Sequence, residues 1–239
     1  MDQLLEDFYS NKFNGFNSHI TLTDNILNTP VPVVELSLGI DTAYLLELAK
    51  KIPLDLMNRP TYPYELQPRF QGWNIQLLWS HNFKNTLISD VYYKKLDKPI
   101  EDKSADNLAK PIQDYLTTVG LDCKLCVLSV FDANGYVRPH RDIGLNNTPL
   151  DYFWIPLNNP TGSQLRIYPY GTVEVTLGNI YLLNQEQFVH SVVNFSEETR
   201  YVLIGHLTNV STKFKSLITQ SIQSNYLTNN PISCTIYDK

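Results

Sequence analysis

Cysteine, positive charge and long apolar runs are all scarce in this sequence, and each shortage excludes a class of protein. Three cysteines, an odd number, do not make the disulfide framework of a small secreted domain, so a reducing, cytoplasmic location is expected. The 19 lysines and arginines are outnumbered by 24 aspartates and glutamates, and the net charge of −5 gives no support for a phosphate-binding surface. No run of about 18 apolar residues could span a membrane, and the acidic N-terminus lacks the apolar stretch of a signal peptide. We therefore expect neither a nucleic-acid nor a membrane partner.

The composition is that of a globular protein with a substantial core. Of the 239 residues, 43% are hydrophobic and 18% are charged. This length allows one generous domain. We expect a single domain over residues 1–239, with an N-terminal arm and supporting helices and strands (1–120), a β-rich core (121–208), and a C-terminal helix and tail (209–239).

Two helices are expected before residue 120. Asp41 can cap a helix that runs to Ala49. A second helix candidate covers residues 103–119, with Gly120 at its C-terminal end and its continuous part beginning at Pro111. Strands are expected at residues 31–38 and 73–79, and residues 1–30 form an arm.

From Leu121 onward, short strands follow one another, separated by turn residues. A strand at 124–131 precedes Asn134-Gly135, the strongest short hairpin signal, so residues 136–142 are expected to be its hairpin partner. Further strands are expected at 151–157, 164–168, 172–176, 179–183, 188–193 and 200–207, and a closing helix at 210 to about 224. This spacing is typical of a β-sandwich or barrel.

The sequence His140-Arg141-Asp142 lies on one of the expected strands. Residues two apart on a strand point to the same face, so the imidazole and the carboxylate can converge on one ion. His190, fifty positions on, would complete a set of two histidines and one carboxylate. That set leaves open positions on the metal and is typical of oxygen-activating iron sites.

Arg200 points to a second component of the same site. If the strands at 188–193 and 200–207 form a simple hairpin centred on Phe195, Arg200 lies opposite His190 and shares its face. An arginine is not a metal ligand, but it can bind in a bidentate manner an acid that also chelates the metal. The alternative is a solvent-facing arginine on a hairpin strand.

These residues resemble a known family. The segment Ser129-Val130-Phe131-Asp132-Ala133-Asn134-Gly135-Tyr136-Val137-Arg138-Pro139-His140-Arg141-Asp142 resembles the first iron motif of the 2-oxoglutarate-dependent oxygenases. It is most similar to the aspartyl/asparaginyl β-hydroxylase-like branch, which includes free-proline hydroxylases. His190-Ser191-Val192-Val193-Asn194-Phe195-Ser196, leading to Arg200, matches that branch's distal histidine and arginine. The resemblance covers about residues 121–208.

The resemblance implies a mainly β fold with flanking helices around a double-stranded β-helix of the jelly-roll, cupin-like type. It implies Fe(II) held by the catalytic residues His140, Asp142 and His190, with 2-oxoglutarate and O2 as cosubstrates. Arg200 would bind the distal carboxylate of 2-oxoglutarate. Ser191 and Trp154 are further candidates for contacting this cosubstrate.

The resemblance does not identify the substrate. Asp142 favours hydroxylation, because halogenating relatives carry a small residue there. Many members have a basic residue on the strand after the first motif, whereas residues 151–157 have none, so Tyr152 and Trp154 are expected to line the pocket instead. Arg138, which has the same parity as His140, and Arg166 are candidates for binding a substrate carboxylate.

Three functions remain open. We favour hydroxylation of a small, amino-acid-like molecule; the alternatives are a peptide or protein side-chain hydroxylase and a non-redox, metal-binding cupin-like protein. A nucleic-acid demethylase is disfavoured by the acidic charge. The sequence does not indicate the oligomeric state.

Three more residue sets have ordinary interpretations. Cys123 and Cys126 are three apart, so on a regular strand they face opposite ways and are interpreted as core and edge cysteines. His206 is interpreted as a hydrogen-bonded core histidine. His81 is a candidate for the edge of the site.

Overall fold

The computed structural model describes residues 33–54, 70–81, 103–140, 152–168, 170–183, 185 and 188–207. The expected N-terminal arm, the closing helix at 210–224 and Asp142 lie outside the described residues. The elements are β1 (Val33–Ser37), α2 (Thr42–Ala49), β2 (Phe70–Ser80), α4 (Lys110–Thr118), β3 (Cys123–His140), β4 (Tyr152–Pro156), β5 (Ser163–Ile167), β6 (Gly171–Val173), β7 (Asn179–Leu183), β8 (His190–Asn194) and β9 (Arg200–Leu207).

Both expected helices are confirmed. The Asp41 side chain accepts a hydrogen bond from the Tyr44 N–H at 2.9 Å and caps α2. Helix α4 begins beside Pro111, whose missing N–H would have no partner in the first turn, and it ends just before Gly120, which adopts φ +86°. Within the described part of the chain, no helix is long and apolar enough to cross a membrane.

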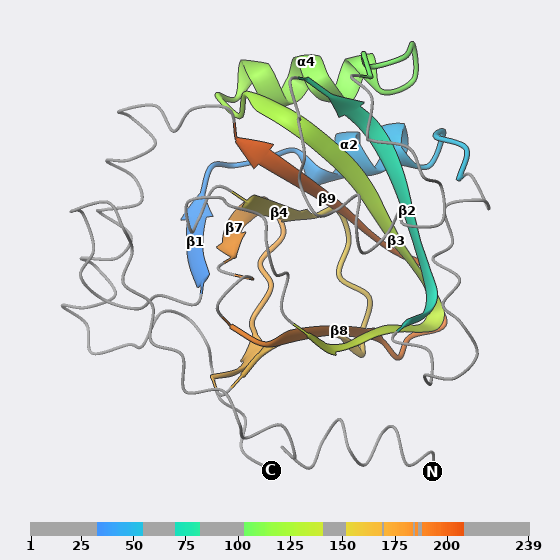
Figure 1. The fold of residues 1–239 in the computed structure, drawn as a ribbon, viewed down its shortest axis with the longest axis vertical. Helices are drawn as coiled ribbons and strands as arrows, with labels where there is room; N and C mark the ends of the chain where they lie inside the picture. Colours follow the sequence, from blue (N-terminus) through green and yellow to red (C-terminus); the bar gives the residue numbers. More distant parts are fainter. Residues whose placement is uncertain are drawn as a thin grey trace, which may run out of the picture.

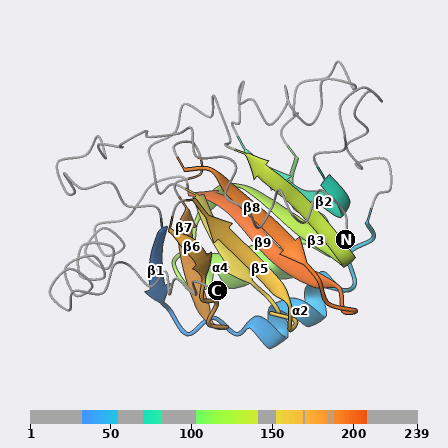
Figure 2. The same ribbon diagram turned by 90° about the horizontal axis from the view of Figure 1, so that it is seen from below.

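The strands form one antiparallel sheet in the order β1-β7-β4-β9-β3-β8-β5-β6, and β2 also pairs with β3. Strand β3 joins two layers, because its first part pairs with β9 and its last part pairs with β8. Figure 1 shows β3 running below α4 in the upper layer and then bending to lie along β8 in the lower layer. Figure 2 shows the molecule from the side of the lower layer. This curled antiparallel arrangement is a double-stranded β-helix, as expected.

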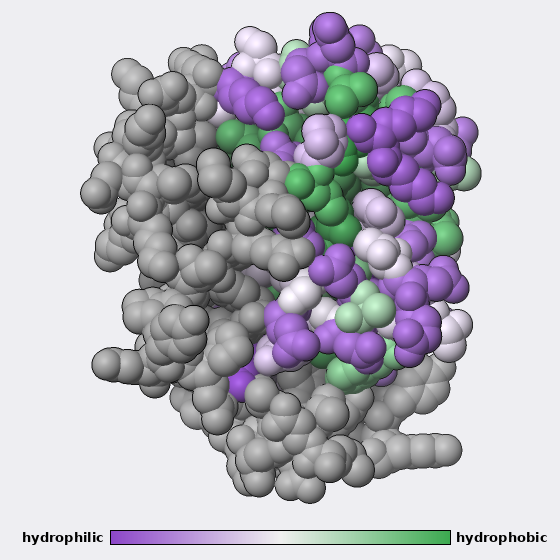
Figure 3. Space-filling model, turned by 90° about the vertical axis from the view of Figure 1, so that its right-hand side faces the viewer, coloured by the Kyte–Doolittle hydropathy of each residue, from purple (hydrophilic) through white to green (hydrophobic). Residues whose placement is uncertain are grey.

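Two apolar regions hold the fold together. Helices α2 and α4 cover the outer face of the upper layer, where Leu45 and Leu116 pack with Phe153 and Leu203. Between the layers lies a second cluster: Val33, Trp154, Leu165, Ile167, Val173, Tyr181, Leu183, Phe188 and Val202. On the face that carries β2 and the bend of β3, hydrophobic residues form a patch with hydrophilic residues above, below and to the right of it (Figure 3). The interior between the layers is the place where a site can be built.

The expected hairpin at Asn134-Gly135 is wrong. Asn134 has a positive φ of 58°, but residues 123–140 form one continuous strand. Instead of pairing with each other, the parts of β3 on either side of Asn134 both pair with β2, whose register jumps from Phe131 to Tyr136. The Asn194 side chain donates to the carbonyl oxygens of Phe131 and Asp132 at 3.2 and 3.0 Å. These contacts from another strand hold the segment as a bulge.

Replacing Gly135 with alanine should destabilise this bend. A Cβ at Gly135 would lie 2.7 Å from the Gly72 carbonyl oxygen and 2.9 Å from that of Asp132, and both obstacles are backbone. We expect Gly135→Ala to lower the free energy of unfolding by about 1–3 kcal/mol, as measured by chemical denaturation. Ala133→Ser, at the exposed neighbouring position, should change it by less than about 0.5 kcal/mol. Equal stability of the two variants would contradict this account of the bend.

Candidate active site

Two histidines meet where β3 ends and β8 begins. His140 and His190 are paired directly in the register of these antiparallel strands. Their ring centroids are 4.3 Å apart, with an angle of 47° between the ring planes. His190 is buried and His140 is half-buried. The structure thus brings together two imidazoles that are fifty positions apart in the sequence.

The backbone determines which nitrogen of each ring carries the hydrogen. Nδ1 of His140 lies 2.7 Å from the Arg138 carbonyl oxygen, and Nδ1 of His190 lies 3.3 Å from that of Phe188. A carbonyl only accepts, so each Nδ1 donates its hydrogen and each Nε2 carries a lone pair. Metal-binding histidines are oriented in this way by an outer hydrogen bond.

The described residues contain part of the expected metal site. No group of three or more His, Cys, Asp or Glu side chains gathers among them. His140 and His190 are the two expected ligands whose positions are described, while Asp142 lies beyond the described end of β3. The carboxylate ligand therefore stays a prediction.

A bulge precedes His140. The pairing of β3 with β8 shifts between Val137 and His140, an interval that contains Pro139, which has no N–H to donate to the ladder. Regular alternation, on which the expectation for Arg138 rested, does not hold across this interval. Arg138 is half-buried and lies in the bulge.

Arg200 is fully buried with one edge of its guanidinium unsatisfied. Nη1 donates to the Gln164 carbonyl oxygen at 3.3 Å, while Nε and Nη2 have no hydrogen-bond partner in the described part of the chain. The ion pairs among the described residues are Lys50–Glu47 and Lys110–Asp114, so no described carboxylate neutralises Arg200. Burial lowers the pKa of its guanidinium to about 9, because desolvation disfavours the charged form.

The expected β8–β9 hairpin is wrong, yet Arg200 still points into the space between the layers. Strand β9 pairs with β3 and β4, and β8 pairs with β3 and β5. Arg200 reaches Gln164 on β5, where Ile167 pairs with His190. Gln164 and Ile167 are three positions apart, roughly 10 Å along the strand. The Arg200 guanidinium and the histidine pair therefore both lie beside β5, at two different positions along this strand.

Tyr152 and Trp154 share one face of β4, opposite the face that packs on the helices, and their role in lining the substrate pocket stays a prediction. Trp154 belongs to the cluster between the layers, and its ring centroid is 5.0 Å from Cζ of Arg200. Tyr152 packs edge-on against His206, with ring centroids 4.8 Å apart. His206 is buried, and its Nδ1 donates to the Leu207 carbonyl oxygen at 3.1 Å, which fits its interpretation as a core histidine.

Ser191 and Arg166 lie on the other face of the lower layer. They pair with each other, and each alternates with residues that face the interior, such as His190 and Ile167. The Arg166 guanidinium stacks over the ring of Tyr168, at 5.2 Å from its centroid. The structure therefore directs both side chains away from the histidine pair, and the regular pleat of β5 and β8 is the reason.

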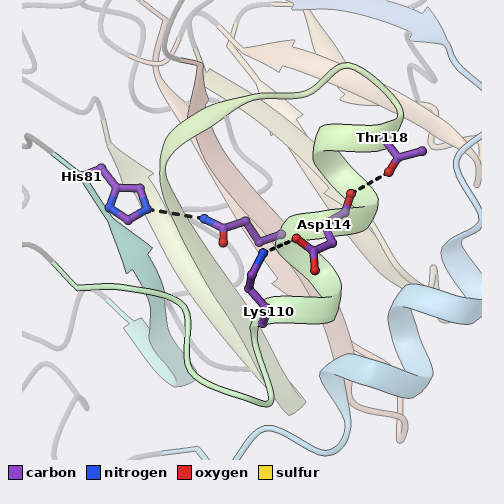
Figure 4. A network of polar contacts seen from close by, with 5 residues as sticks. His81, Lys110, Asp114 and Thr118 are labelled. Carbon is purple, nitrogen blue, oxygen red and sulfur yellow. Dashed lines mark hydrogen bonds and ion pairs between the residues drawn. The ribbon is translucent and has the colours of Figure 1, made fainter.

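His81 is far from the histidine pair. Its Nε2 lies 3.4 Å from the Gln113 side chain of α4, and Figure 4 shows it beside this helix, near the Lys110–Asp114 ion pair. The neighbouring Ser80 pairs with Leu125, close to the start of β3, whereas His140 is at its end. His81 therefore does not edge this site.

The contact of Phe131 with Arg200 was missed from the sequence. Phe131 is directly opposite Arg200 across β3 and β9, with its ring centroid 5.8 Å from Cζ of Arg200. Trp73 stacks on Phe131 at 6.0 Å between centroids. Phe131 stands in the family-like motif, but nothing in the sequence indicates which strand faces it.

A comparison with protein families identifies the family of this chain. A family model described as Aspartyl/Asparaginyl beta-hydroxylase matches residues 64–209, more than half of the chain. The chain therefore belongs to the aspartyl/asparaginyl β-hydroxylase family. It is a non-haem iron dioxygenase that uses Fe(II), 2-oxoglutarate and O2.

Two solved structures show a partial similarity to this chain. A Pseudomonas putida prolyl-4-hydroxylase is 16% identical, with 74% of this chain and 92% of that one covered and a TM-score of 0.41. A Burkholderia pseudomallei oxidoreductase of the 2OG-Fe(II) oxygenase family is 13% identical, with 73% and 83% covered and a TM-score of 0.44. No curated protein matches the chain significantly.

The described residues fit the iron and the cosubstrate. The two rings have the hydrogen placement of metal-bound histidines. The edge of Arg200 that has no hydrogen-bond partner among the described residues has the shape and charge to receive one carboxylate.

Proposed function

We propose that His140, His190 and Asp142 hold Fe(II), and that Arg200 binds the distal carboxylate of 2-oxoglutarate. The enzyme then hydroxylates an unactivated C–H bond of a small, amino-acid-like substrate. Iron held by these residues would supply oxidation by O2, coupled to decarboxylation of 2-oxoglutarate to succinate and CO2. The observation that carries the proposal is the buried guanidinium edge of Arg200, which is anchored at Gln164 on the same strand, β5, whose Ile167 pairs with His190.

Each residue has a distinct task. The Arg138 and Phe188 carbonyl oxygens orient the two imidazoles, so that their Nε2 atoms are the ones presented to a metal. Nε and Nη2 of Arg200 form one edge of a planar group and can donate two parallel hydrogen bonds to a carboxylate. Gln164 fixes Nη1 and so limits rotation of the guanidinium.

The family name describes oxidation at the β-carbon of aspartyl or asparaginyl groups, so it supports a substrate with amino-acid chemistry but does not favour the free form over a peptide. The interior of β4 carries Tyr152 and Trp154 and no cation, so a substrate acid group would be bound elsewhere. Arg138 is half-buried in the bulge just before His140, and we propose it for that role from this proximity rather than from strand parity. Asp142 favours hydroxylation because it fills the position that halogenating relatives leave for chloride.

A screen of substrates tests this proposal. The enzyme, loaded with Fe(II) and 2-oxoglutarate, is incubated with individual free amino acids and with short peptides that contain Asp, Asn or Pro. Succinate release and a product heavier by one oxygen atom are followed by mass spectrometry. We expect turnover of a free amino acid or a close derivative. Turnover of peptides alone would replace the small-substrate proposal with side-chain hydroxylation.

A further inference from the structure

Two aromatic rings surround the buried charge of Arg200. Cζ of Arg200 is 5.0 Å from the ring centroid of Trp154 and 5.8 Å from that of Phe131. Both distances are within the range of about 6 Å for a cation–π interaction. The three side chains come from different strands, since Phe131 belongs to β3, Trp154 to β4 and Arg200 to β9.

The rings are themselves held in place. Trp154 packs edge-on against Tyr181, with centroids 5.6 Å apart and planes at 72°. Phe131 stacks on Trp73, whose Nε1 donates to the Ser129 hydroxyl at 2.8 Å. The surfaces that Arg200 contacts are therefore fixed by a second set of contacts that does not include Arg200.

The two aromatic rings offset the cost of burying the Arg200 charge before the cosubstrate binds. A buried cation is costly unless something compensates its charge, and a carboxylate of the protein would occupy the edge that the cosubstrate needs. Aromatic faces attract the cation without accepting hydrogen bonds in the guanidinium plane. The Gln164 carbonyl takes only Nη1, so the edge made by Nε and Nη2 is preserved.

We propose that Phe131 and Trp154 are positioning residues, which hold the guanidinium of Arg200 with its Nε–Nη2 edge ready for the cosubstrate carboxylate. This inference rests on the proposed function, and it assigns part of the affinity for 2-oxoglutarate to two residues that act through Arg200. Trp154 should contribute more than Phe131 to 2-oxoglutarate affinity, because it is the nearer ring and tryptophan is the stronger cation–π partner.

The test measures 2-oxoglutarate binding to the iron-loaded enzyme without oxygen, by titration of the visible absorption of the chelate. We expect Trp154→Leu to raise the Kd about ten-fold, Phe131→Leu about three-fold, and Trp154→Phe, which keeps an aromatic face, less than Trp154→Leu. For Phe131→Leu, the KM for 2-oxoglutarate should change by a larger factor than kcat, because no reacting group has changed.

Phe153→Leu is the matched control. Phe153 adjoins Trp154 on β4 and is fully buried, but it packs on the helical side of the sheet. It should lose stability as Trp154→Leu does while keeping the wild-type Kd.

The outcomes separate this inference from the function on which it rests. If Arg200→Met abolishes tight binding while Trp154→Leu and Phe131→Leu keep the wild-type Kd, the positioning role is overturned and the carboxylate clamp stands. Should Phe153→Leu raise the Kd as much as Trp154→Leu, the effect is one of general stability and the inference fails. Wild-type binding by Arg200→Met would remove the clamp itself.

Discussion

Replacing Arg200 with methionine is expected to abolish tight binding of 2-oxoglutarate while leaving the metal-free protein at least as stable as wild type. Two charge-assisted hydrogen bonds are lost, so the Kd should rise at least about 100-fold. The fold should not suffer, because the charge removed is buried without a carboxylate partner among the described residues, and methionine keeps an unbranched apolar side chain. Anaerobic titration gives the Kd, and thermal unfolding of the apo-protein gives the stability.

This pair of measurements distinguishes a binding residue from a structural one. Replacing an arginine that stabilises the fold would lower the melting temperature. An arginine that serves only to bind its ligand destabilises the ligand-free protein, so its replacement should not lower the melting temperature. Arg166→Met makes the same chemical change on the opposite face of β5 and should leave the Kd unchanged. Tight binding by Arg200→Met, or a large fall in its apo stability, would contradict the assignment.

Replacing His140 or His190 with alanine should abolish turnover while the fold survives. Loss of an outer hydrogen bond to a metal-binding histidine already costs about 10–100-fold in metal affinity, so loss of the ligand itself should cost more than about 100-fold. The fold is expected to persist because both rings lie at strand ends, outside the main apolar clusters. Iron content after equilibrium dialysis checks metal binding, succinate release checks turnover, and circular dichroism checks the fold.

His81→Ala is the matched control for the histidine variants, since this imidazole contacts Gln113 beside α4 (Figure 4). It should bind iron and turn over as wild type does. Asp142→Ala extends the test to the third ligand and should likewise lose turnover. Full activity in His140→Ala or His190→Ala would remove the iron site from this position.

The metal-site motif could be recognised from sequence because its chemistry depends on residue type and spacing. His140 and His190 stand in family-like segments, and the structure pairs them across β3 and β8. Helix α2 could also be predicted from the sequence, because its Asp41 cap is a local interaction. The positions of most strands followed from turn residues that flank short apolar runs.

The partners of the strands could not be predicted, because long-range contacts override local signals. Asn134-Gly135 favours a hairpin, but Asn194 binds the carbonyl oxygens of Phe131 and Asp132 and keeps β3 continuous. The hairpin expected around Phe195 fails for a similar reason. Strands β8 and β9 separate because β3 is long enough to pair with both.

Bulges explain where alternation failed. A register shift between Cys123 and Leu125 accompanies the placement of Cys123 and Cys126 in the same buried cluster, although their spacing predicts opposite faces. The register shift before His140 likewise removes the parity argument by which Arg138 was expected to share the face of His140. An extra residue reverses the parity of every residue that follows, and it leaves no mark in composition. The regular strand β5, in contrast, directs Arg166 to the outer face.

The most direct test of the central claim is an anaerobic titration of the metal-free protein with Fe(II) and 2-oxoglutarate, followed by the weak visible charge-transfer absorption of the chelate. The account predicts that the band appears in the wild type and is absent from Arg200→Met at the same 2-oxoglutarate concentration, although that variant still binds iron. Iron binding by the wild type without any such band, at any 2-oxoglutarate concentration, would contradict it.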